Sequence, residues 1–463
     1  MGGSIPSFFE TLKDRQVSVV GLGVTNNDLI RMMLRKGVGV TVYDLKPRER
    51  VEALADELEA QGARLVLGPD AMDRLAGEVI FRAPGVYFHR PELEAARKAG
   101  RVVTSEMEVF FDLCPCPTIA VTGSDGKTTT TTLITEMLRA QGLTVHLGGN
   151  IGKALVPEIE TIQPHHWAVV ELSSFQLISM RCSPDIAVVT NVAPNHLDVH
   201  RDMEEYIDAK KNILLHQGGF SKTVLGADNA VTLSFAPLVR GVLRTFSRKE
   251  AVPRGAWMDD QKVLWYSDGQ QKTRLMDAAE IRIPGLHNVE NMLAAISAVW
   301  GIVSLEAIRQ VAKEFGGVEH RIEFVRELDG VRWYNDSIAS SPSRTMAGLR
   351  AFDQKLIIIA GGYDKKIPFT PLAPVLVERV KTLILTGPTA DSIEAAVRAE
   401  PGFGDSGLEI YRAGDLAGAV ELARRTAKAG DIVSLSPACA SFDAYPNFEY
   451  RGRHFKELVR QLT

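Results

Sequence analysis

At 463 residues, the chain has room for about three domains of ~150 residues each. Hydrophobic residues make up 45% and charged residues 24%, the balance of an ordinary globular protein. A net charge of −4 gives no large basic field, so we expect no nucleic-acid partner. No signal segment opens the sequence and no apolar run reaches about 18 residues. We therefore expect a cytoplasmic protein without membrane insertion.

The four cysteines are too few and too scattered for a disulfide framework. Cys114-Pro-Cys116 lacks the two-residue gap and the second pair of a structural zinc site. We expect unpaired thiols at Cys114, Cys116, Cys182 and Cys439.

Short β-branched runs alternate with amphipathic helical stretches, a pattern that favours α/β folding with mainly parallel sheets. In the first region the predicted strands are 16–21, 38–44, 64–67, 78–82 and 101–104. The Cys-Pro-Cys-Pro stretch at 114–117 interrupts this pattern, because proline is poorly suited to the interior of a helix or strand. A buried strand at 118–122 then starts a new unit.

The last third of the chain repeats the alternation. Its predicted strands are 331–335, 355–360, 381–386, 408–411 and 431–435, and its clearest helix is 416–428. We predict three domains: a Rossmann-like domain at 1–105, a central P-loop ATPase domain with a mainly parallel sheet at 106–317, and a Rossmann-like C-terminal domain at 318–463.

A phosphate-binding loop is predicted between the strand at 118–122 and a helix at 128–140. Its residues are Gly123, Ser124, Asp125, Gly126, Lys127, Thr128 and Thr129. Glycines let backbone N–H groups face phosphate oxygens, Lys127 can neutralise phosphates, and the Thr128 hydroxyl can bind Mg²⁺. Val121 stands where a Walker A motif has its first glycine, so this is a compact G-x-x-G-K-T variant. The alternative is a tight turn with a surface lysine, which the flanking strand and helix disfavour.

A second glycine turn, Gly21-Leu-Gly23, follows the first strand, and Asp44 ends the second strand about 20 residues later. This resembles a dinucleotide fingerprint, but Asn26 occupies the place of the third glycine, which weakens a nicotinamide interpretation. A purely structural turn stays possible. We favour a domain that holds a nucleotide diphosphate at Val24–Asn26 and a uracil or ribose near Asp44.

Oxygen and nitrogen ligands suited to metal ions follow two further strands. Glu171 ends an apolar strand, and His196 lies in Asn195-His196-Leu-Asp198 after another strand that we predict to include Thr190. Lys210 follows on a helix, in Glu205-Tyr-Ile-Asp-Ala-Lys210. Taken singly, each has an ordinary alternative: a solvated glutamate, a structural histidine and a solvated lysine.

These motifs, in this order, resemble those of the Mur ligase superfamily over nearly the whole chain. They are G-x-x-G-K-T, ELSSFQL (171–177), N-x-x-x-NHLD (191–198), E-x-Y-x-x-A-K (204–210), Pro284-Gly-Leu-His-Asn288-Val-Glu-Asn291, Glu319-His-Arg321 and Asn335-Asp336-Ser337. ELSSFQL and the 436–448 segment with Arg451-Gly452 are similar to the D-glutamate-adding members, and the D-N-P-R signature of diaminopimelate- or lysine-adding members is absent.

The resemblance implies an amide ligase that uses ATP and two Mg²⁺ ions, with Mn²⁺ able to replace Mg²⁺. It implies an acyl phosphate made from UDP-N-acetylmuramoyl-L-alanine and then attacked by D-glutamate. The first metal would be held by Thr128 and Glu171, and the second by His196 and by Lys210 carrying a CO₂-derived carbamate. Carbamylation needs a neutral amine, so the pKa of Lys210 must be lowered. Lys127, Glu171, His196 and Lys210 would form the catalytic set.

The resemblance also assigns ligand contacts. ATP would be bound by the loop residues 123–129 and by Asn288, Asn291, Arg321 and Asp336. The UDP-substrate would be bound by Val24, Thr25, Asp44, Gly85, Asn150, Ser173 and Gln176. D-glutamate would be bound by Ser340, Lys365, Ser441, Phe442 and Phe448.

Two residues depart from the family pattern. Asp125 stands where asparagine is common, and Ile338 replaces a lysine found in many members. An isoleucine makes no charge contact, so Lys365 should matter more for the carboxylates of D-glutamate.

Other functions remain open from the residues alone: folylpolyglutamate synthetase or another Mur ligase, a nicotinamide dehydrogenase, and a non-catalytic nucleotide-binding module. A folylpolyglutamate synthetase would not explain a separate Rossmann-like first domain. Asn26 disfavours the dehydrogenase. A module that only binds nucleotides would need no second metal ion. We expect a monomer.

Overall fold

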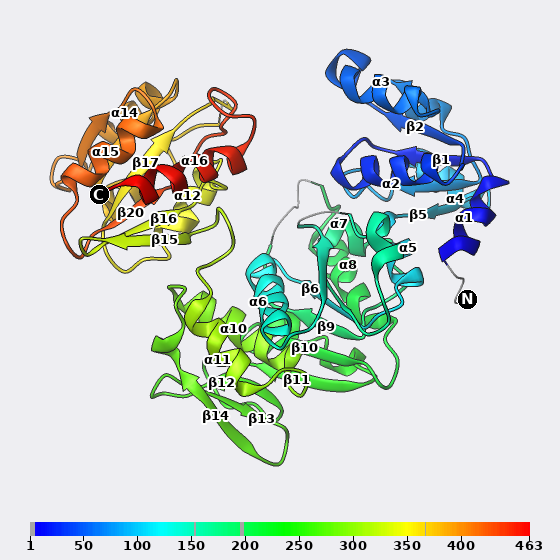
Figure 1. Cartoon of the computed structure of the whole chain (residues 1–463), viewed down its shortest axis with the longest axis horizontal. Helices are drawn as coiled ribbons and strands as arrows, with labels where there is room; N and C mark the ends of the chain where they lie inside the picture. The colour runs from blue at the N-terminus through cyan, green and yellow to red at the C-terminus, as the bar shows by residue number, and fades with distance from the viewer. Residues whose placement is uncertain (1–4, 152–153, 195–198, 366) are drawn as a thin grey trace. The chain divides into compact units, whose positions relative to one another are not determined.

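The computed structural model describes residues 5–151, 154–194, 199–365 and 367–463 of a mixed α/β chain in three domains (Figure 1). The chain forms two compact units. One contains the residues up to Glu280 together with Val289–Lys313, and the other contains Ile281–Asn288 together with Glu314–Thr463. The predicted domain boundaries near 105 and 317 stay a prediction. No helix in the described ranges is long and apolar enough to cross a membrane.

The first sheet is wholly parallel and has the strand order β3-β2-β1-β4-β5. Its strands are β1 (Val17–Val20), β2 (Val40–Asp44), β3 (Arg64–Leu67), β4 (Val79–Arg82) and β5 (Val102–Thr104). Its helices are α1 (Ile5–Lys13), α2 (Val24–Arg35), α3 (Glu52–Ala60), α4 (Pro91–Lys98) and α5 (Glu106–Leu113), with short 3₁₀ turns η1 (Arg48–Arg50) and η2 (Met72–Arg74). The strand order reverses between β1 and β4, and open α/β sheets bind ligands at the carboxyl end of such a reversal.

The second sheet, β11-β10-β9-β6-β8-β7, is also parallel. Its strands are β6 (Thr118–Thr122), β7 (Val145–Gly149), β8 (Trp167–Glu171), β9 (Ile186–Val189), β10 (Lys222–Gly226) and β11 (Val242–Phe246). The helical segments of this region are α6 (Lys127–Ala140), η3 (Val156–Thr161), α7 (Ser174–Leu177), α8 (Met203–Leu215), α9 (Ala230–Leu233), η4 (Ala236–Leu238), η5 (Ala278–Glu280), α10 (Leu286–Val299) and α11 (Leu305–Glu314). An antiparallel sheet follows, formed by β12 (Gly255–Met258), β13 (Val263–Ser267) and β14 (Lys272–Asp277).

The third sheet has the order β15-β16-β20-β17-β18-β19, with only β15 antiparallel to its neighbour among the pairs described. Its strands are β15 (Glu323–Leu328), β16 (Val331–Asn335), β17 (Leu356–Gly361), β18 (Val380–Thr386), β19 (Glu409–Arg412) and β20 (Ile432–Leu435). Its helices are α12 (Pro342–Leu349), α13 (Ala373–Arg379), α14 (Ala390–Arg398), α15 (Leu416–Thr426) and α16 (Phe448–Gln461).

Helices cover both faces of this third sheet, and β17 shows why. Its side chains Leu356, Ile358 and Ala360 belong to the core shared with α12, α13 and α14, whereas Ile357 and Ile359 belong to the core shared with α15 and α16. Successive strand residues point to opposite faces, so an uninterrupted apolar run is what a strand covered on both sides requires.

The predicted strands of the first and last regions are confirmed to within two residues at each end. The prediction that Thr190 belongs to a strand was wrong, because β9 ends at Val189 and the Thr190 hydroxyl instead donates to the carbonyl oxygen of Asp125. The strands β12–β14 and the antiparallel strand β15 were not predicted from the sequence. The four cysteines are free, as expected.

A buried glutamate joins the end of the first domain to the second. Glu106, in the first turn of α5, accepts hydrogen bonds from the backbone N–H groups of Leu155 (2.9 Å) and Val156 (2.8 Å) at the start of η3. Its second oxygen has no hydrogen-bond partner among the described residues, and burial raises the pKa of this carboxyl to about 7. The carboxyl is therefore protonated in the folded chain up to a higher pH than an exposed glutamate is.

We expect Glu106→Gln to flatten the dependence of stability on pH. A carboxyl whose pKa is raised on folding destabilises the fold as pH rises through the window from its ordinary value, near 4.5, to about 7. Glutamine keeps the oxygen that accepts both N–H groups but does not ionise. Relative to the parent, the variant should gain about 1–3 kcal/mol of unfolding free energy between pH 5 and pH 8. Urea unfolding at both pH values measures this, with exposed Glu52→Gln as the control, and parallel pH curves for variant and parent would contradict it.

Candidate active site

The predicted phosphate loop runs from the end of β6 to the start of α6, and two of its glycines have no room for a side chain. Gly123 and Gly126 have φ of 157° and 76°. A Cβ on Gly123 would lie 1.8 Å from the Thr190 Oγ1, and one on Gly126 would lie 2.2 Å from the Asn291 Oδ1. The G-x-x-G spacing therefore lets the loop pack against two neighbours while its amides remain at the positive end of α6.

Two lysines converge on this loop. Lys127 Nζ donates to the carbonyl oxygens of Gly123 (3.0 Å) and Ser124 (2.8 Å), and Lys210 Nζ donates to the same Gly123 oxygen (2.8 Å). Lys210 is only 1% exposed. Burial, followed by the nearby charge of Lys127, lowers the pKa of Lys210 well below its ordinary value. This direction agrees with the prediction that the pKa of Lys210 is lowered.

The E-x-Y-x-x-A-K motif lies on α8, where Tyr206 and the neighbouring Glu205 each make separate contacts. Tyr206 hydroxyl lies 2.9 Å from the Ser124 Oγ in the phosphate loop, and its ring centroid lies 4.6 Å from the Lys210 Nζ. Glu205 accepts a hydrogen bond from the Tyr87 hydroxyl (2.8 Å) and pairs with the His200 Nδ1 (3.1 Å). The sequence analysis singled out Lys210 but missed Tyr206 and Glu205 as parts of the site.

Glu171 ends β8 and has the arrangement expected of a cation ligand. One carboxylate oxygen accepts a hydrogen bond from the Asn150 Nδ2 at 2.6 Å, while Oε2 is buried without a hydrogen-bond partner among the described residues. A free anionic oxygen in a buried position suits Mg²⁺, a hard cation. The half-buried Thr128 lies in the first turn of α6, and His196 lies outside the described residues. Within the described ranges, no three His, Cys, Asp or Glu side chains cluster as a metal site, so other oxygens would have to complete it.

A cavity of about 440 Å³ lies at the carboxyl ends of β1 and β4, where the strand order of the first sheet reverses. It is lined by Gly21, Leu22, Gly23, Asn26, Asp44, Lys46, Ala83, Pro84, Gly85, Val86, Gly149, Asn150 and Gln176. The structure thus brings together four residues predicted for the UDP-substrate, which are Asp44, Gly85, Asn150 and Gln176. Val24 and Thr25 begin α2 directly after Gly23.

The polar groups of this cavity are held by the backbone. Asp44 accepts hydrogen bonds from the N–H groups of Leu22 (2.6 Å) and Lys46 (2.8 Å), and the Asn26 amide donates to the Gly21 carbonyl oxygen (2.9 Å). The Asn26 Oδ1 is buried without a partner among the described atoms. Asn26 therefore braces the glycine turn in place of a third glycine. The sequence analysis missed Lys46, although it is only two residues after Asp44.

Ser173, also predicted for the UDP-substrate, does not line this cavity and has a local structural contact. Its hydroxyl and the Gln176 side chain form a capping box at the start of α7. Ser173 is therefore placed to orient Gln176, which does line the cavity.

The residues predicted for ATP fall in both compact units. Asn291 lies beside the phosphate loop, where its Oδ1 accepts a hydrogen bond from the Thr130 hydroxyl (3.3 Å). Asn288 belongs to the second unit and donates to the Pro284 carbonyl oxygen (2.6 Å). Also in the second unit, Asp336 accepts a hydrogen bond from the Ser436 hydroxyl (3.0 Å), and burial raises its pKa to about 7 although the charge of Arg321 opposes this.

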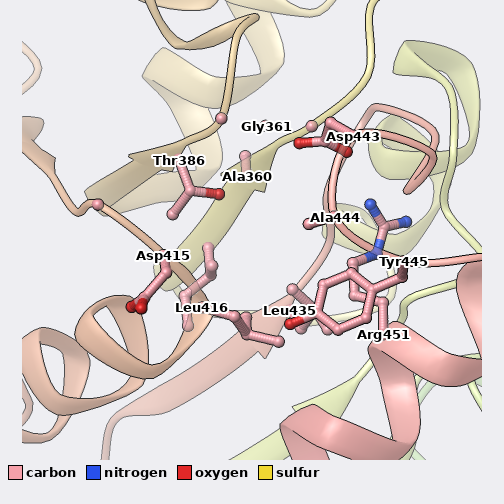
Figure 2. Close-up of a pocket in the computed structure, with 14 residues that line it drawn as sticks. Ala360, Gly361, Thr386, Asp415, Leu416, Leu435, Asp443, Ala444, Tyr445 and Arg451 are labelled. Carbon is pink, nitrogen blue, oxygen red and sulfur yellow. The ribbon is translucent and has the colours of Figure 1, made fainter.

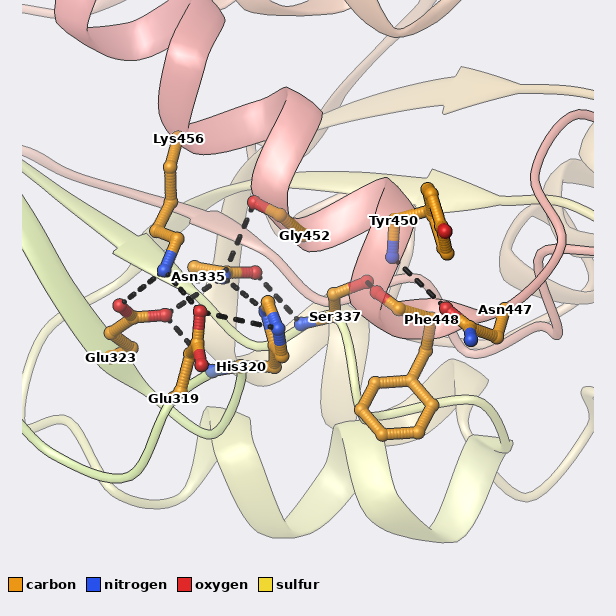
Figure 3. Close-up of polar contacts among 10 residues, drawn as sticks. All are labelled: Glu319, His320, Glu323, Asn335, Ser337, Asn447, Phe448, Tyr450, Gly452 and Lys456. Atoms are coloured by element: carbon orange, nitrogen blue, oxygen red, sulfur yellow. Dashed lines mark hydrogen bonds and ion pairs between the residues drawn. The ribbon is translucent and has the colours of Figure 1, made fainter. Parts of the chain in front are cut away.

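The segment around Arg321 has a strained backbone and is held by contacts with the last helix, α16. His320 and Ile322 have φ of 65° and 45°, in the left-handed region that favours glycine. Figure 3 shows Lys456 of α16 between Glu319 and Glu323, with its Nζ 2.8 Å from an oxygen of each. Glu323 in turn accepts a hydrogen bond from the backbone N–H of His320 (2.9 Å). These contacts hold the backbone on both sides of Arg321.

The loops that carry the predicted D-glutamate residues meet at the carboxyl edge of the third sheet. Lys365 Nζ donates to the carbonyl oxygen of Ser340 (3.1 Å), and the rings of Phe442 and Tyr363 are 5.8 Å apart. Phe448 begins α16, and its carbonyl oxygen accepts a hydrogen bond from the Ser337 hydroxyl (2.7 Å). Ser441 is buried at the same edge, whereas Phe442 is 63% exposed.

A smaller cavity of about 120 Å³ lies beside these loops (Figure 2). Arg451, Asp443 and Tyr445 contribute to its lining, with the ends of β17, β18 and β20. Arg451 is buried and donates to the carbonyl oxygens of Ser337, Cys439 and Ala440 and to the Ser337 hydroxyl. Arg451 therefore ties the loop after β20 to the loop after β16.

Known proteins that are similar to this chain match it along its whole length. Sequence profiles of the MurD-like N-terminal domain, the Mur ligase middle domain and the Mur ligase glutamate ligase domain match residues 15–105, 121–299 and 320–439. The chain is 48% identical over 465 residues to the UDP-N-acetylmuramoylalanine–D-glutamate ligase of Acetivibrio thermocellus, and 45% identical over 463 residues to that of Clostridium botulinum. Each alignment covers 100% of both chains. The chain belongs to the Mur ligase family.

Solved structures show the same fold at low sequence identity. UDP-N-acetylmuramate-alanine ligase from Thermotoga maritima aligns with a TM-score of 0.55 at 18% identity, covering 96% of this chain and 99% of its own. UDP-N-acetylmuramoyl-L-alanyl-D-glutamate–2,6-diaminopimelate ligase aligns with a TM-score of 0.56 at 18% identity, covering 96% and 93%. Mur ligases use ATP and Mg²⁺, and the free oxygen of Glu171 beside the phosphate loop fits that requirement.

We expect Tyr206→Phe to weaken ATP use while leaving the rest of the site intact. The variant loses the contact with the Ser124 hydroxyl but keeps a ring beside Lys210. A neutral hydrogen bond contributes about 0.5–1.5 kcal/mol, so the Michaelis constant for ATP should rise roughly 2–10-fold. Tyr206→Leu, which also removes the ring, should lower kcat as well. Steady-state ADP release measures both, with Tyr266→Phe in the antiparallel sheet as the control. An unchanged constant in Tyr206→Phe would show that the hydroxyl contact does not order the loop.

Proposed function

We propose that this Mur ligase adds D-glutamate to UDP-N-acetylmuramoyl-L-alanine in peptidoglycan precursor synthesis, using ATP. The observation that carries the proposal is that the chain is 45–48% identical, over its full length, to proteins named UDP-N-acetylmuramoylalanine–D-glutamate ligase. Two features of the structure, one cavity and one loop, support the proposal physically. The 440 Å³ cavity suits a nucleotide diphosphate and its sugar, and the cationic loop of the second sheet suits the phosphates of ATP.

The reaction needs no protein nucleophile. The substrate carboxylate attacks the γ-phosphorus of ATP, a bond to the bridging oxygen breaks, and ADP leaves an acyl phosphate. The amine of D-glutamate then attacks the acyl carbon, inorganic phosphate leaves, and the amine gives up a proton. Lys127 and the loop amides neutralise charge on the phosphates, and alignment supplies most of the remaining rate enhancement.

The metal-binding residues would be Thr128 and Glu171 for one Mg²⁺, and His196 and Lys210 for a second, with Mn²⁺ as a substitute. The ions would neutralise phosphate charge and align the reacting oxygens. A protonated lysine repels a cation, but a neutral Lys210 amine can add CO₂ and release a proton, which leaves an anionic carbamate. Burial and the charge of Lys127 favour the neutral amine that this addition requires.

The D-glutamate pocket would lie at the carboxyl edge of the third sheet. Lys365 is the cation among the residues proposed for it, and Ser340, Ser441 and the backbone of Phe442 offer neutral donors. Ile338 is half-buried in the same region and makes no charge contact, which leaves more of the carboxylate binding to Lys365.

A coupled ADP-release assay over a panel of UDP-muramoyl acceptors and amino acids tests the proposal. ADP release should require both UDP-N-acetylmuramoyl-L-alanine and D-glutamate, and L-glutamate should be a poor substrate because inversion moves one carboxylate away from its donors. Preference for another amino acid would show that the protein is a Mur ligase of different amino-acid specificity. Tighter calorimetric binding of NAD than of UDP would favour a dehydrogenase instead.

We expect Lys210→Ala to abolish ligase activity, because it removes both the carbamate and its oxygens. Acetate or another short carboxylate should restore part of the activity by supplying an anionic oxygen in the space left behind. The neighbouring Lys211→Ala is the matched control, since Lys211 pairs with Asp208 instead of contacting the phosphate loop. Near-parent turnover in Lys210→Ala would refute the metal role of this residue.

We expect Lys365→Ala to raise the Michaelis constant for D-glutamate and leave that for ATP nearly unchanged. A charge-assisted hydrogen bond contributes about 1.5–3 kcal/mol, which corresponds to roughly 10–200-fold. Steady-state kinetics at saturating ATP and UDP-substrate measures the change. Lys355→Ala serves as the control, because Lys355 is an exposed lysine of the same domain that donates to the Ser406 carbonyl oxygen. An unchanged D-glutamate constant in the Lys365 variant would overturn this assignment.

A further inference from the structure

Arg82, the last residue of β4, is an unusual occupant of a buried strand end. It is 1% exposed, and its guanidinium donates mainly to backbone oxygens. Nη1 contacts the carbonyl oxygens of Ala83 (3.2 Å), Pro84 (3.4 Å) and Val86 (2.7 Å). Nη2 contacts the Phe175 carbonyl oxygen (2.8 Å) and the Ser179 hydroxyl (3.3 Å). The guanidinium thus binds two segments that are about 90 residues apart, as the separations of 93 and 97 positions show.

Both segments form walls of the 440 Å³ cavity. Residues 83–86 line it directly, and Phe175 immediately precedes Gln176, which also lines it. One side chain therefore sets the separation of the two walls. A planar guanidinium with five N–H donors in fixed directions can do this, whereas a lysine has a single flexible nitrogen.

The charge of Arg82 is not matched by a carboxylate in direct contact among the residues described. The Ser179 hydroxyl that Arg82 contacts also donates to the half-buried Glu108 carboxylate at 3.0 Å. Burial lowers the pKa of Arg82 to about 10, so the group still carries its charge at neutral pH. An apolar side chain would fill a buried strand end without the desolvation cost of a cation, so the hydrogen bonds to both walls are the evident reason for an arginine here.

We propose that Arg82 is a positioning residue for the nucleotide-sugar substrate, which fixes the 83–86 loop against the start of α7 and so shapes the pocket that receives the uridine diphosphate. This rests on the proposed function. Arg82 acts through the backbone of the loop and through the turn that carries Gln176. The phosphate loop lies on another strand end, so ATP binding should not depend on Arg82.

The test compares Arg82→Met, Arg82→Lys and Ser179→Ala with the parent in the full-length chain. Arg82→Met keeps the volume of the stem but removes every donor, and it should raise both the Michaelis constant for the UDP-substrate and the calorimetric dissociation constant for UDP about 10–100-fold. The Michaelis constant for ATP, and kcat at saturating substrate, should stay within about threefold of the parent. Arg82→Lys should give an intermediate increase, and Ser179→Ala, which removes one contact, a smaller one.

Arg101→Met is the matched control, because Arg101 is an exposed arginine of the same domain that donates to the Leu75 carbonyl oxygen, away from the cavity. A folded Arg82→Met with parental UDP affinity would overturn the proposal. So would parallel losses for UDP and ATP together with a lowered Tm, because these would assign Arg82 to general stability. Where Arg82→Met does not fold, unchanged UDP binding in both Arg82→Lys and Ser179→Ala would also overturn it. Failure of the parent itself to bind UDP would refute the proposed function instead.

Discussion

Lys127 and Lys210 both donate a hydrogen bond to the carbonyl oxygen of Gly123, and the chemistry of the site depends on this shared contact. Two ammonium groups so close repel each other, and the buried one loses its proton more easily. The contact is possible because Gly123 adopts a backbone conformation with no room for a side chain and because Tyr206 holds the neighbouring Ser124. Loop geometry, the positive charge at the start of α6 and the lowered pKa of Lys210 are therefore consequences of one arrangement.

Asn150 extends this arrangement to the nucleotide cavity. It follows β7, lines the 440 Å³ cavity, and donates to the carboxylate of Glu171 at 2.6 Å. Its backbone N–H also donates to the Glu171 carbonyl oxygen at 2.8 Å, so side chain and main chain fix the pair together. A substrate that fills the cavity would contact Asn150, whose side chain is hydrogen-bonded to Glu171, the proposed metal ligand. The hydrogen bonds of Asn150 thus connect the lining of the cavity to the carboxylate that is proposed as a metal ligand.

Much of the fold and the position of the phosphate loop could be predicted from the sequence, because the sequence patterns that indicate them are local. A strand followed by G-x-x-G-K-T and a helix specifies where the phosphate loop lies, and continuous apolar runs specify buried parallel strands such as β6 and β17. The antiparallel strands β12–β14 were missed because the alternating α/β pattern gave no reason to expect a meander in that region. Tyr206 and Arg82 were missed because their contacts with Ser124 and with Phe175 and Ser179 join residues far apart in sequence, which no spacing rule reveals.

Three of the buried cations among the described residues, Arg82, Arg451 and Lys210, show how arginine and lysine differ. Arg82 and Arg451 bind backbone carbonyl oxygens, as Lys210 does, and burial lowers the pKa of all three. The arginines start from so high a value that burial leaves their pKa at about 10, and they remain charged braces between loops. The lysine starts from a lower pKa and has a second cation beside it, so burial lowers its pKa well below the ordinary value and favours the neutral amine. An arginine at 210 would keep its charge, and a lysine at 82 or 451 would bind fewer of the carbonyl oxygens that join the two loops.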